Sequence, residues 1–220
     1  MKDIYIYIHI CCINNWKEII NNILQKIKKT GLYDIIKEIR CVVLGNIDIS
    51  QESLFKDDKI KVIYYSNNIN LYERKILSLL YEDSQKEDFY VLYLHSKGVK
   101  YDGKYESITD WVNYLLYFNI NYYEFIIKEL KNHNTIGVNL TRRKPYHYSG
   151  NFWWSKSEYI KTLNPHIDSN YLSPEFWITQ KLIDEPKKFL SLWKSSGNHY
   201  FVKYPEKKYI NKKLKLYYIL

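Results

Sequence analysis

The amino-acid sequence predicts a single α/β domain with a mostly parallel central sheet flanked by helices. Three observations support this prediction. Apolar, β-branched segments alternate with helical patterns, the length of 220 residues suits one large domain, and no linker rich in glycine or serine divides the chain. Apolar residues make up 46% and charged residues 26%, as in folded domains and unlike disordered chains.

The first strand is expected at residues 4–10, where the run I-Y-I-Y-I-H-I is typical of a strand covered on both faces. Apolar residues at helical spacing then predict a helix over residues 16–27, with Gly31 as its stop. The same patterns predict strands at 39–44, 60–65, 89–94 and 135–140, and helices at 71–81, 111–118, 122–130, 157–163 and 174–183. This β-α-β alternation indicates a parallel sheet.

The charge balance favours an anionic partner. Lys and Arg number 33 against 24 Asp and Glu, which gives a net charge of +9 and a pI near 9.1. Nucleic acid, a membrane surface and a phosphorylated small molecule all fit such a charge. The 24 tyrosines and 6 tryptophans exceed what core filling requires, so some are expected to line a binding surface.

Missing motifs argue against enzymes that bind NAD, P-loop NTPases, zincin metalloproteases and α/β-hydrolases. The glycines form neither the dinucleotide fingerprint nor a P-loop, and the sequence has no H-E-x-x-H, G-x-S-x-G or Asp-x-Asp. No apolar run approaches the roughly 20 residues that span a bilayer. Cys11, Cys12 and Cys41 lack C-x-x-C spacing, so a reducing, cytoplasmic location is expected.

The first candidate site is His95-Ser96-Lys97-Gly98, directly after the predicted strand at 89–94. Ligands of open α/β sheets bind outside the carboxyl ends of the strands. Lys97 can neutralise a diphosphate, His95 and Ser96 can donate hydrogen bonds, and Gly98 permits close backbone approach. A polar turn with a solvated lysine is the alternative.

The second candidate is the basic, aromatic segment 142–154. If residues 151–154 are extended, Trp153 and Trp154 point to opposite faces, so that one can pack in the core while the other offers a platform for a sugar or a base. The alternative is a hairpin with both tryptophans in the core. Groups for binding hydroxyls and an expected turn lie at His147, Ser149, Gly150 and Asn151.

The third candidate is Ser173-Pro174-Glu175, which has the pattern of a helix start with Ser173 as N-cap. A glutamate in the first turn is explained by the helix dipole. The same position also holds a carboxylate rigidly, as a general base requires. Both interpretations of Glu175 remain open from the sequence.

Taken in order, these segments resemble a family of small glycosyltransferases found in large DNA viruses, including the chlorella-virus type, and in bacterial polysaccharide gene clusters. The resemblance covers roughly residues 60–180 and includes Asp110-Trp111 and residues 136–139, and its most specific block is residues 147–154. It implies a single Rossmann-like GT-A domain over residues 1–220, with a nucleotide-binding half at about 1–100, an acceptor half at about 101–200 and a basic, tyrosine-rich tail at 203–220.

The resemblance also implies roles for individual residues. Lys97 would stabilise the departing diphosphate, and Glu175 would be the base beside the acceptor. Ile8 and His9 would meet the nucleoside by their position at the end of the first strand. The substrate contacts implied are Ile8, His9, His95, Ser96, Gly98, His147, Ser149, Gly150, Asn151, Trp153, Trp154 and Trp177.

The implied activity is transfer of a hexosyl or deoxyhexosyl group from a nucleotide sugar, usually a UDP-sugar, to a hydroxyl of a glycan or glycoprotein. A Mn²⁺ or Mg²⁺ requirement stays open, because His95-Ser96-Lys97 stand where most GT-A enzymes carry Asp-x-Asp, and a lysine can supply the same charge. If the protein is viral, it would act in the host cytoplasm. A non-catalytic glycan-binding module, or a degenerate transferase, is the alternative. Nucleic-acid binding is disfavoured, because no recognised binding motif accompanies the charge.

Overall fold

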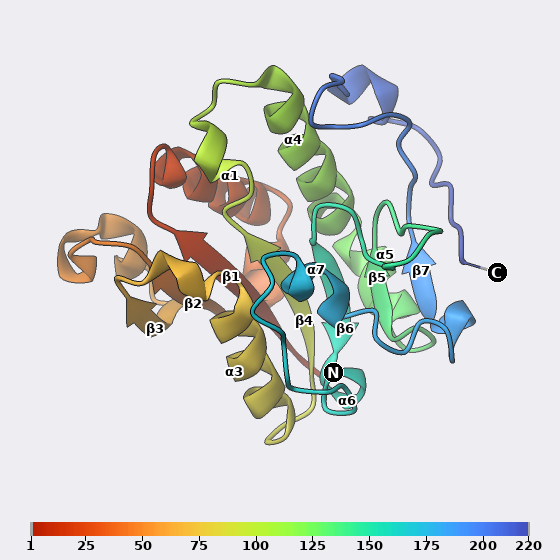
Figure 1. Ribbon diagram of the computed structural model, residues 1–220, viewed down its shortest axis with the longest axis horizontal. Coiled ribbons are helices and arrows are strands. Elements are labelled where there is room, and N and C mark those ends of the chain that lie inside the picture. Colours follow the sequence, from red (N-terminus) through yellow and green to blue (C-terminus); the bar gives the residue numbers. More distant parts are fainter. Residues whose placement is uncertain (1, 220) are drawn as a thin grey trace.

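A seven-stranded sheet runs through the centre of the computed structural model, which describes residues 2–219 (Figure 1). The strand order is β3-β2-β1-β4-β6-β5-β7. All neighbouring strands are parallel except β6, which runs antiparallel to β4 and β5. The strands are β1 (Asp3–Cys11), β2 (Glu38–Leu44), β3 (Ile60–Ser66), β4 (Phe89–His95), β5 (Thr135–Gly137), β6 (Trp153–Lys156) and β7 (Phe189–Ser191).

Helices cover both faces of this sheet, as Figure 1 shows for α1 and α4 on one side and α3 on the other. Strand β1 explains why both faces need cover, because its isoleucines enter one core and Tyr5 and Tyr7 enter the other. The helices are α1 (Trp16–Lys29), α2 (Leu32–Ile35), α3 (Arg74–Ser84), α4 (Glu106–Asn121), α5 (Tyr123–Glu129), α6 (Ser157–Ile160) and α7 (Ser173–Trp177). None of the helices in residues 2–219 is long and apolar enough to cross a membrane.

The predicted fold class, an α/β domain with a mostly parallel sheet flanked by helices, is confirmed. Some element bounds differ. The strand predicted at 135–140 ends at Gly137, and Asn139 beyond it has a φ of 54° that no strand accommodates. The helix predicted at 174–183 ends at Trp177 and is preceded by Leu172 at the N-cap position, so Ser173 lies inside the helix and makes no cap bond.

The basic tail at 203–220 packs on the domain over its described residues. Tyr204 and Tyr209 are buried against α4, beside Tyr114. Ser191 of β7 and Tyr217 exchange two backbone hydrogen bonds of 3.0 Å, so the tail extends the edge of the sheet (Figure 1). The described part of the tail is therefore a packed element of the domain.

Candidate functional site

A cavity of about 350 Å³ opens where β1 and β4 end. The two strands are parallel neighbours, so the residues that follow them emerge at the same edge of the sheet. His9 and Cys11 line the cavity from β1, and His95, Ser96 and Lys97 line it from β4. The cavity therefore lies where the sequence predicts a ligand.

Lys97 supplies the cation of this cavity. Its Nζ lies 3.8 Å from the centroid of the Trp111 ring on α4, an attractive cation–π contact. Burial lowers the pKa of Lys97 to about 8, although the nearby carboxylates of Glu175 and Glu73 oppose this shift. Lys97 is therefore charged at neutral pH and half-buried, which differs from the solvated lysine of the alternative interpretation.

Gly98 makes the turn after Lys97 possible. Its φ is +90°, and a Cβ at this position would lie 2.9 Å from the Cγ2 atom of Ile108. Any side chain would therefore be strained and crowded at once. Ser96 joins the strand ends, because its Oγ accepts a 2.9 Å hydrogen bond from the backbone N–H of Cys11 and its own N–H donates to the carbonyl of His9.

His95 is held in one tautomer. Its Nε2 lies 3.1 Å from the carbonyl oxygen of Gly150, which can only accept, so Nε2 carries the proton. Burial lowers the pKa of His95 to about 3, and the charge of Lys97 acts in the same direction. His95 is neutral, and its Nδ1 lies 4.0 Å from the Oε1 atom of Glu73.

Glu73 also lines the cavity, and sequence reasoning did not single it out. It stands directly before α3, and its Oε2 accepts hydrogen bonds from Tyr93 Oη at 2.5 Å and from Asn151 Nδ2 at 2.6 Å. The Oδ1 of Asn151 in turn accepts from Trp153 Nε1 at 2.9 Å. Asn151 and Trp153, expected to touch a sugar, instead hold this carboxylate in place.

Glu175, which the resemblance implies to be the base, lines the same cavity from α7. Its Oε2 lies 4.0 Å from Nε2 of His147, which is the contact that His147 makes toward the site. No hydrogen bond from another residue within 2–219 reaches the Glu175 carboxylate in the structure, so both its oxygens can accept a proton or a hydroxyl.

His9 is buried, and its Nδ1 has no hydrogen-bond partner among residues 2–219. Burial lowers the pKa of His9 to about 4, with Glu73 opposing the shift, so the imidazole is neutral at neutral pH. His9 lines the cavity, but its unpaired Nδ1 is itself enclosed by protein atoms. Ile8, the other residue expected to meet the nucleoside, is fully buried in the core.

The remaining predicted residues do not line the cavity. Trp153 and Trp154 do point to opposite faces of the sheet, but both are buried, so the alternative with two core tryptophans is the one observed. Trp177 is also buried and donates to the carbonyl of Asn164. The segment of Ser149 and Gly150 contributes the carbonyl that orients His95.

Aromatic rings around the cavity were not assigned from the sequence. Tyr101, Trp111, Tyr171 and Tyr200 all line it, and Tyr171 and Tyr200 are exposed at the surface. These rings come from four separate segments, so no local motif marks them. The tyrosine surplus is the sequence signal for the three tyrosines, and Trp111 belongs to the Asp110-Trp111 pair of the resemblance, which gave it no role.

The donor set does not favour a bound metal. In residues 2–219, no group of three or more His, Cys, Asp or Glu side chains is arranged to hold a metal ion. The acids of the cavity, Glu73 and Glu175, are accompanied by a lysine, and Glu73 is engaged by protein donors.

Comparisons with known proteins give two kinds of result. Among solved structures, the chain is similar to a candidate nucleotide-diphospho-sugar transferase from Desulfovibrio desulfuricans G20, with a TM-score of 0.47, 8% identity and coverage of 89% of this chain and 83% of that one. It is also similar to a 4-diphosphocytidyl-2C-methyl-D-erythritolsynthase from Anaerococcus prevotii DSM 20548, with a TM-score of 0.45, 12% identity and 94% of both chains covered. No curated protein matches the chain.

One family is shown by its sequence model. Residues 11–183 match the family described as a domain of unknown function, DUF8361. The match begins at the last residue of β1 and includes the loop after β4 and all of α7. Since this match spans well over half of the chain and contains Lys97, Glu73 and Glu175, the protein belongs to the DUF8361 family.

Proposed function

We propose that the protein is a glycosyltransferase of the GT-A type, which moves a sugar from a nucleotide sugar to a hydroxyl of a glycan or glycoprotein. One observation carries the proposal. A charged lysine, Lys97, and two carboxylates, Glu73 and Glu175, line one cavity at the carboxyl ends of parallel strands. Residues from both the expected nucleotide-binding half, before about position 100, and the expected acceptor half, after it, line this cavity.

Lys97 is placed to receive the diphosphate. A diphosphate carries charge that grows as the sugar leaves, and a fixed cation in a partly desolvated cavity stabilises that charge without reorganising. The contact with Trp111 holds the ammonium group in the cavity before substrate binds. His9, near the end of β1, also lines the cavity and is the residue proposed to meet the nucleotide.

Glu175 suits the role of base better than Glu73. Glu73 already accepts two short hydrogen bonds on Oε2, which fix its position and occupy that oxygen. Glu175 has no such bonds from residues 2–219 and can accept a proton. We assign Glu73 to orienting the sugar and His95, and Glu175 to activating the acceptor.

The proposed reaction is a substitution at the anomeric carbon of the donor sugar. The acceptor oxygen forms a bond to the anomeric carbon, the bond from that carbon to the diphosphate oxygen breaks, and the electron pair leaves with the nucleoside diphosphate. The hydroxyl proton passes to Glu175, and Lys97 neutralises the charge on the leaving group. The proposed donor is a UDP-sugar, and the proposed transferred group is a hexosyl or deoxyhexosyl unit.

A panel of UDP- and other nucleotide sugars tests the proposal, with release of free nucleoside diphosphate as the readout. We expect release with at least one donor, and a loss of at least about 100-fold in Glu175→Gln, because a general base contributes about 10²–10⁴-fold. Glu82→Gln, an exposed change on α3, is the matched control and should keep wild-type turnover.

Two outcomes would count against the proposal. Glycan binding, seen as a raised melting temperature, with no release from any donor would support the non-catalytic module instead. Wild-type release by Glu175→Gln would remove Glu175 from the role of base while leaving the transferase in place.

A further inference from the structure

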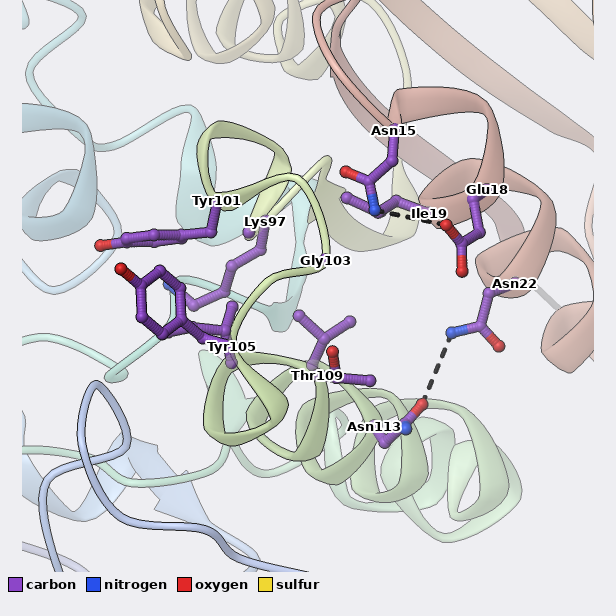
Figure 2. A pocket seen from close by; sticks show the side chains of 13 residues that line it. Asn15, Glu18, Ile19, Asn22, Lys97, Tyr101, Gly103, Tyr105, Thr109 and Asn113 are labelled. Atoms are coloured by element: carbon purple, nitrogen blue, oxygen red, sulfur yellow. Dashed lines mark hydrogen bonds between the residues drawn. The ribbon is translucent and has the colours of Figure 1, made fainter.

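A second cavity lies between α1 and α4, on the other side of the loop that follows β4. Figure 2 shows Asn15, Glu18 and Asn22 of the α1 segment facing Thr109 and Asn113 of α4. Its volume is about 380 Å³, within the range of roughly 300–1,000 Å³ typical of small-molecule sites. We call this cavity the α1–α4 groove.

The lining of the α1–α4 groove is amide-rich and close to neutral. Three asparagines, Asn15, Asn22 and Asn113, offer both donors and acceptors, while Ile19 and Val112 supply apolar surface. The charged lining residues are one acid, Glu18, and one base, Lys97. A neutral ligand with many hydroxyls and an apolar face fits this lining better than a phosphate or a carboxylate does.

The amides of the groove retain unused hydrogen-bonding capacity. The Oδ1 of Asn15 is buried and has no partner among residues 2–219, and its Nδ2 makes only a 3.4 Å bond to Glu18. Asn22 and Asn113 meet at 3.5 Å, the upper limit of a hydrogen bond, as the dashed line in Figure 2 indicates. Asn22 and Asn113 are only half-buried, so their remaining amide donors and acceptors are open to a ligand in the groove.

The groove adjoins the proposed transfer site. Four residues, Lys97, Gly98, Tyr101 and Ile108, line both cavities, so the turn after β4 is their shared wall. The rings of Tyr101 and Tyr105 meet edge to face, with centroids 5.6 Å apart, at the rim beside Lys97 (Figure 2). An occupant of the groove thus lies next to the donor cavity but outside it.

We infer that the α1–α4 groove binds a neutral sugar unit of the acceptor, one or more units away from the hydroxyl that is glycosylated. This inference rests on the proposed function and names its substrate class: an acceptor with at least two sugar units, of which one is uncharged. Asn15, Asn22 and Asn113 bind its hydroxyls, and Ile19 and Val112 pack on its apolar face.

Saturation-transfer NMR with the methyl glycosides of glucose, galactose, mannose and rhamnose tests the inference without any nucleotide sugar. At least one glycoside should bind. Asn22→Leu and Asn113→Leu, one on each helix, should each raise its dissociation constant at least fivefold. Asn21→Leu is the matched control, because Asn21 is the exposed neighbour of Asn22 on α1 and does not line the groove, so binding should stay within twofold. Unchanged melting temperatures show that the variants fold.

The outcomes separate this inference from the proposed function. If no glycoside binds, or if both groove variants bind like the wild type, the inference is wrong even where nucleotide sugars are turned over. If the groove variants instead weaken UDP in isothermal titration at least fivefold, the groove holds a nucleoside and the inference is wrong. If glycosides bind in the groove but no nucleotide sugar is bound or cleaved, the proposed function fails and the groove remains a sugar site.

Discussion

The charge of Lys97 is the residue-scale feature on which the proposed chemistry depends. An ammonium group taken from water loses hydration, which is why burial lowers the pKa of Lys97 to about 8. Trp111 offers its ring face to the charge at 3.8 Å, and two carboxylates line the same cavity. With a pKa of about 8 the lysine is protonated at neutral pH, as the proposed binding of a diphosphate requires.

This pKa predicts a pH dependence. A lysine with a lowered pKa loses its charge as pH rises, so kcat/KM for the nucleotide sugar should fall above about pH 8, by about tenfold per pH unit. In Lys97→Arg the cation persists far above this range, so the fall near pH 8 should disappear even if the absolute rate is lower. A rate profile from pH 6 to 10 measures both, and a break at pH 8 in Lys97→Arg would contradict the assignment.

The two buried histidines should leave the profile flat on its acidic side. Burial lowers the pKa of His9 to about 4 and that of His95 to about 3, so both stay neutral from pH 5 upward. His9 and His95 therefore contribute hydrogen-bonding groups and shape to the cavity rather than positive charge.

At the scale of elements, the turn that precedes β6 lies between α4 and the end of β4. Gly150 has a φ of +101°, and a Cβ there would lie 2.5 Å from the Cδ1 of Leu115 on α4. Its carbonyl accepts the hydrogen bond that orients His95. The turn thus couples α4, β4 and β6 through one residue without a side chain.

Gly150→Ala is expected to lower the free energy of unfolding by at least about 2 kcal/mol, since overpacking and the positive φ both oppose the added methyl group. Gly197→Ala is the control, because its φ is +100° but its nearest neighbouring atom lies 3.6 Å from the added Cβ. Urea denaturation of the two variants isolates the crowding, which should cost about 1–3 kcal/mol more at Gly150. Equal losses would contradict this description of the turn.

The parallel strands could be predicted because their residues are apolar on both faces, as residues 4–10 illustrate. The direction of β6 could not, because Trp153 and Trp154 look the same in either direction. Their burial likewise depends on partners in other elements, such as Asn119, whose carbonyl accepts from Trp154 Nε1. Local sequence does not contain such partners.

The candidate site was predictable where it follows a strand directly. His95 is the last residue of β4, Ser96 and Lys97 follow it directly, and all three line the cavity. Glu73 lies after the end of β3 beyond a short turn, with no motif around it, so its place beside Tyr93 follows only from the tertiary fold. Asn151 belongs to the most specific block of the resemblance, but it does not line the cavity, and its Nδ2 donates to the carboxylate of Glu73.

At the scale of the whole molecule, the C-terminal tail completes the core beside α4. Tyr209 is buried against Tyr114 and Phe118, and its hydroxyl has no partner among residues 2–219. The ring therefore stabilises the fold, while the hydroxyl loses its hydration without gaining a hydrogen bond within the protein.

Two substitutions at Tyr209 separate these contributions. Tyr209→Phe should leave the free energy of unfolding unchanged or raise it by up to about 1 kcal/mol, since an unpaired polar group is removed. Tyr209→Ala should lower it by about 3–5 kcal/mol through loss of the ring. Chemical denaturation measures both, and a loss in Tyr209→Phe as large as in Tyr209→Ala would show that the hydroxyl is satisfied and that the packing account is wrong.

The charge of the molecule also acts as a whole. The net charge of +9 attracts anionic substrates toward the protein, but only a cation within the cavity can bind a diphosphate specifically. Lys104 is exposed on the loop after β4, and its Nζ lies 3.7 Å from Oδ2 of Asp102. It adds to the net positive charge as Lys97 does, but it does not line the cavity. The two lysines can therefore be compared directly.

Isothermal titration with uridine diphosphate makes this comparison and tests the central claim that Lys97 receives the diphosphate. Wild-type protein and Lys104→Ala should bind with affinities within twofold of each other, whereas Lys97→Ala should bind at least about tenfold more weakly, as expected for loss of a charge-assisted hydrogen bond. Equal affinities of Lys97→Ala and the wild type would contradict the account.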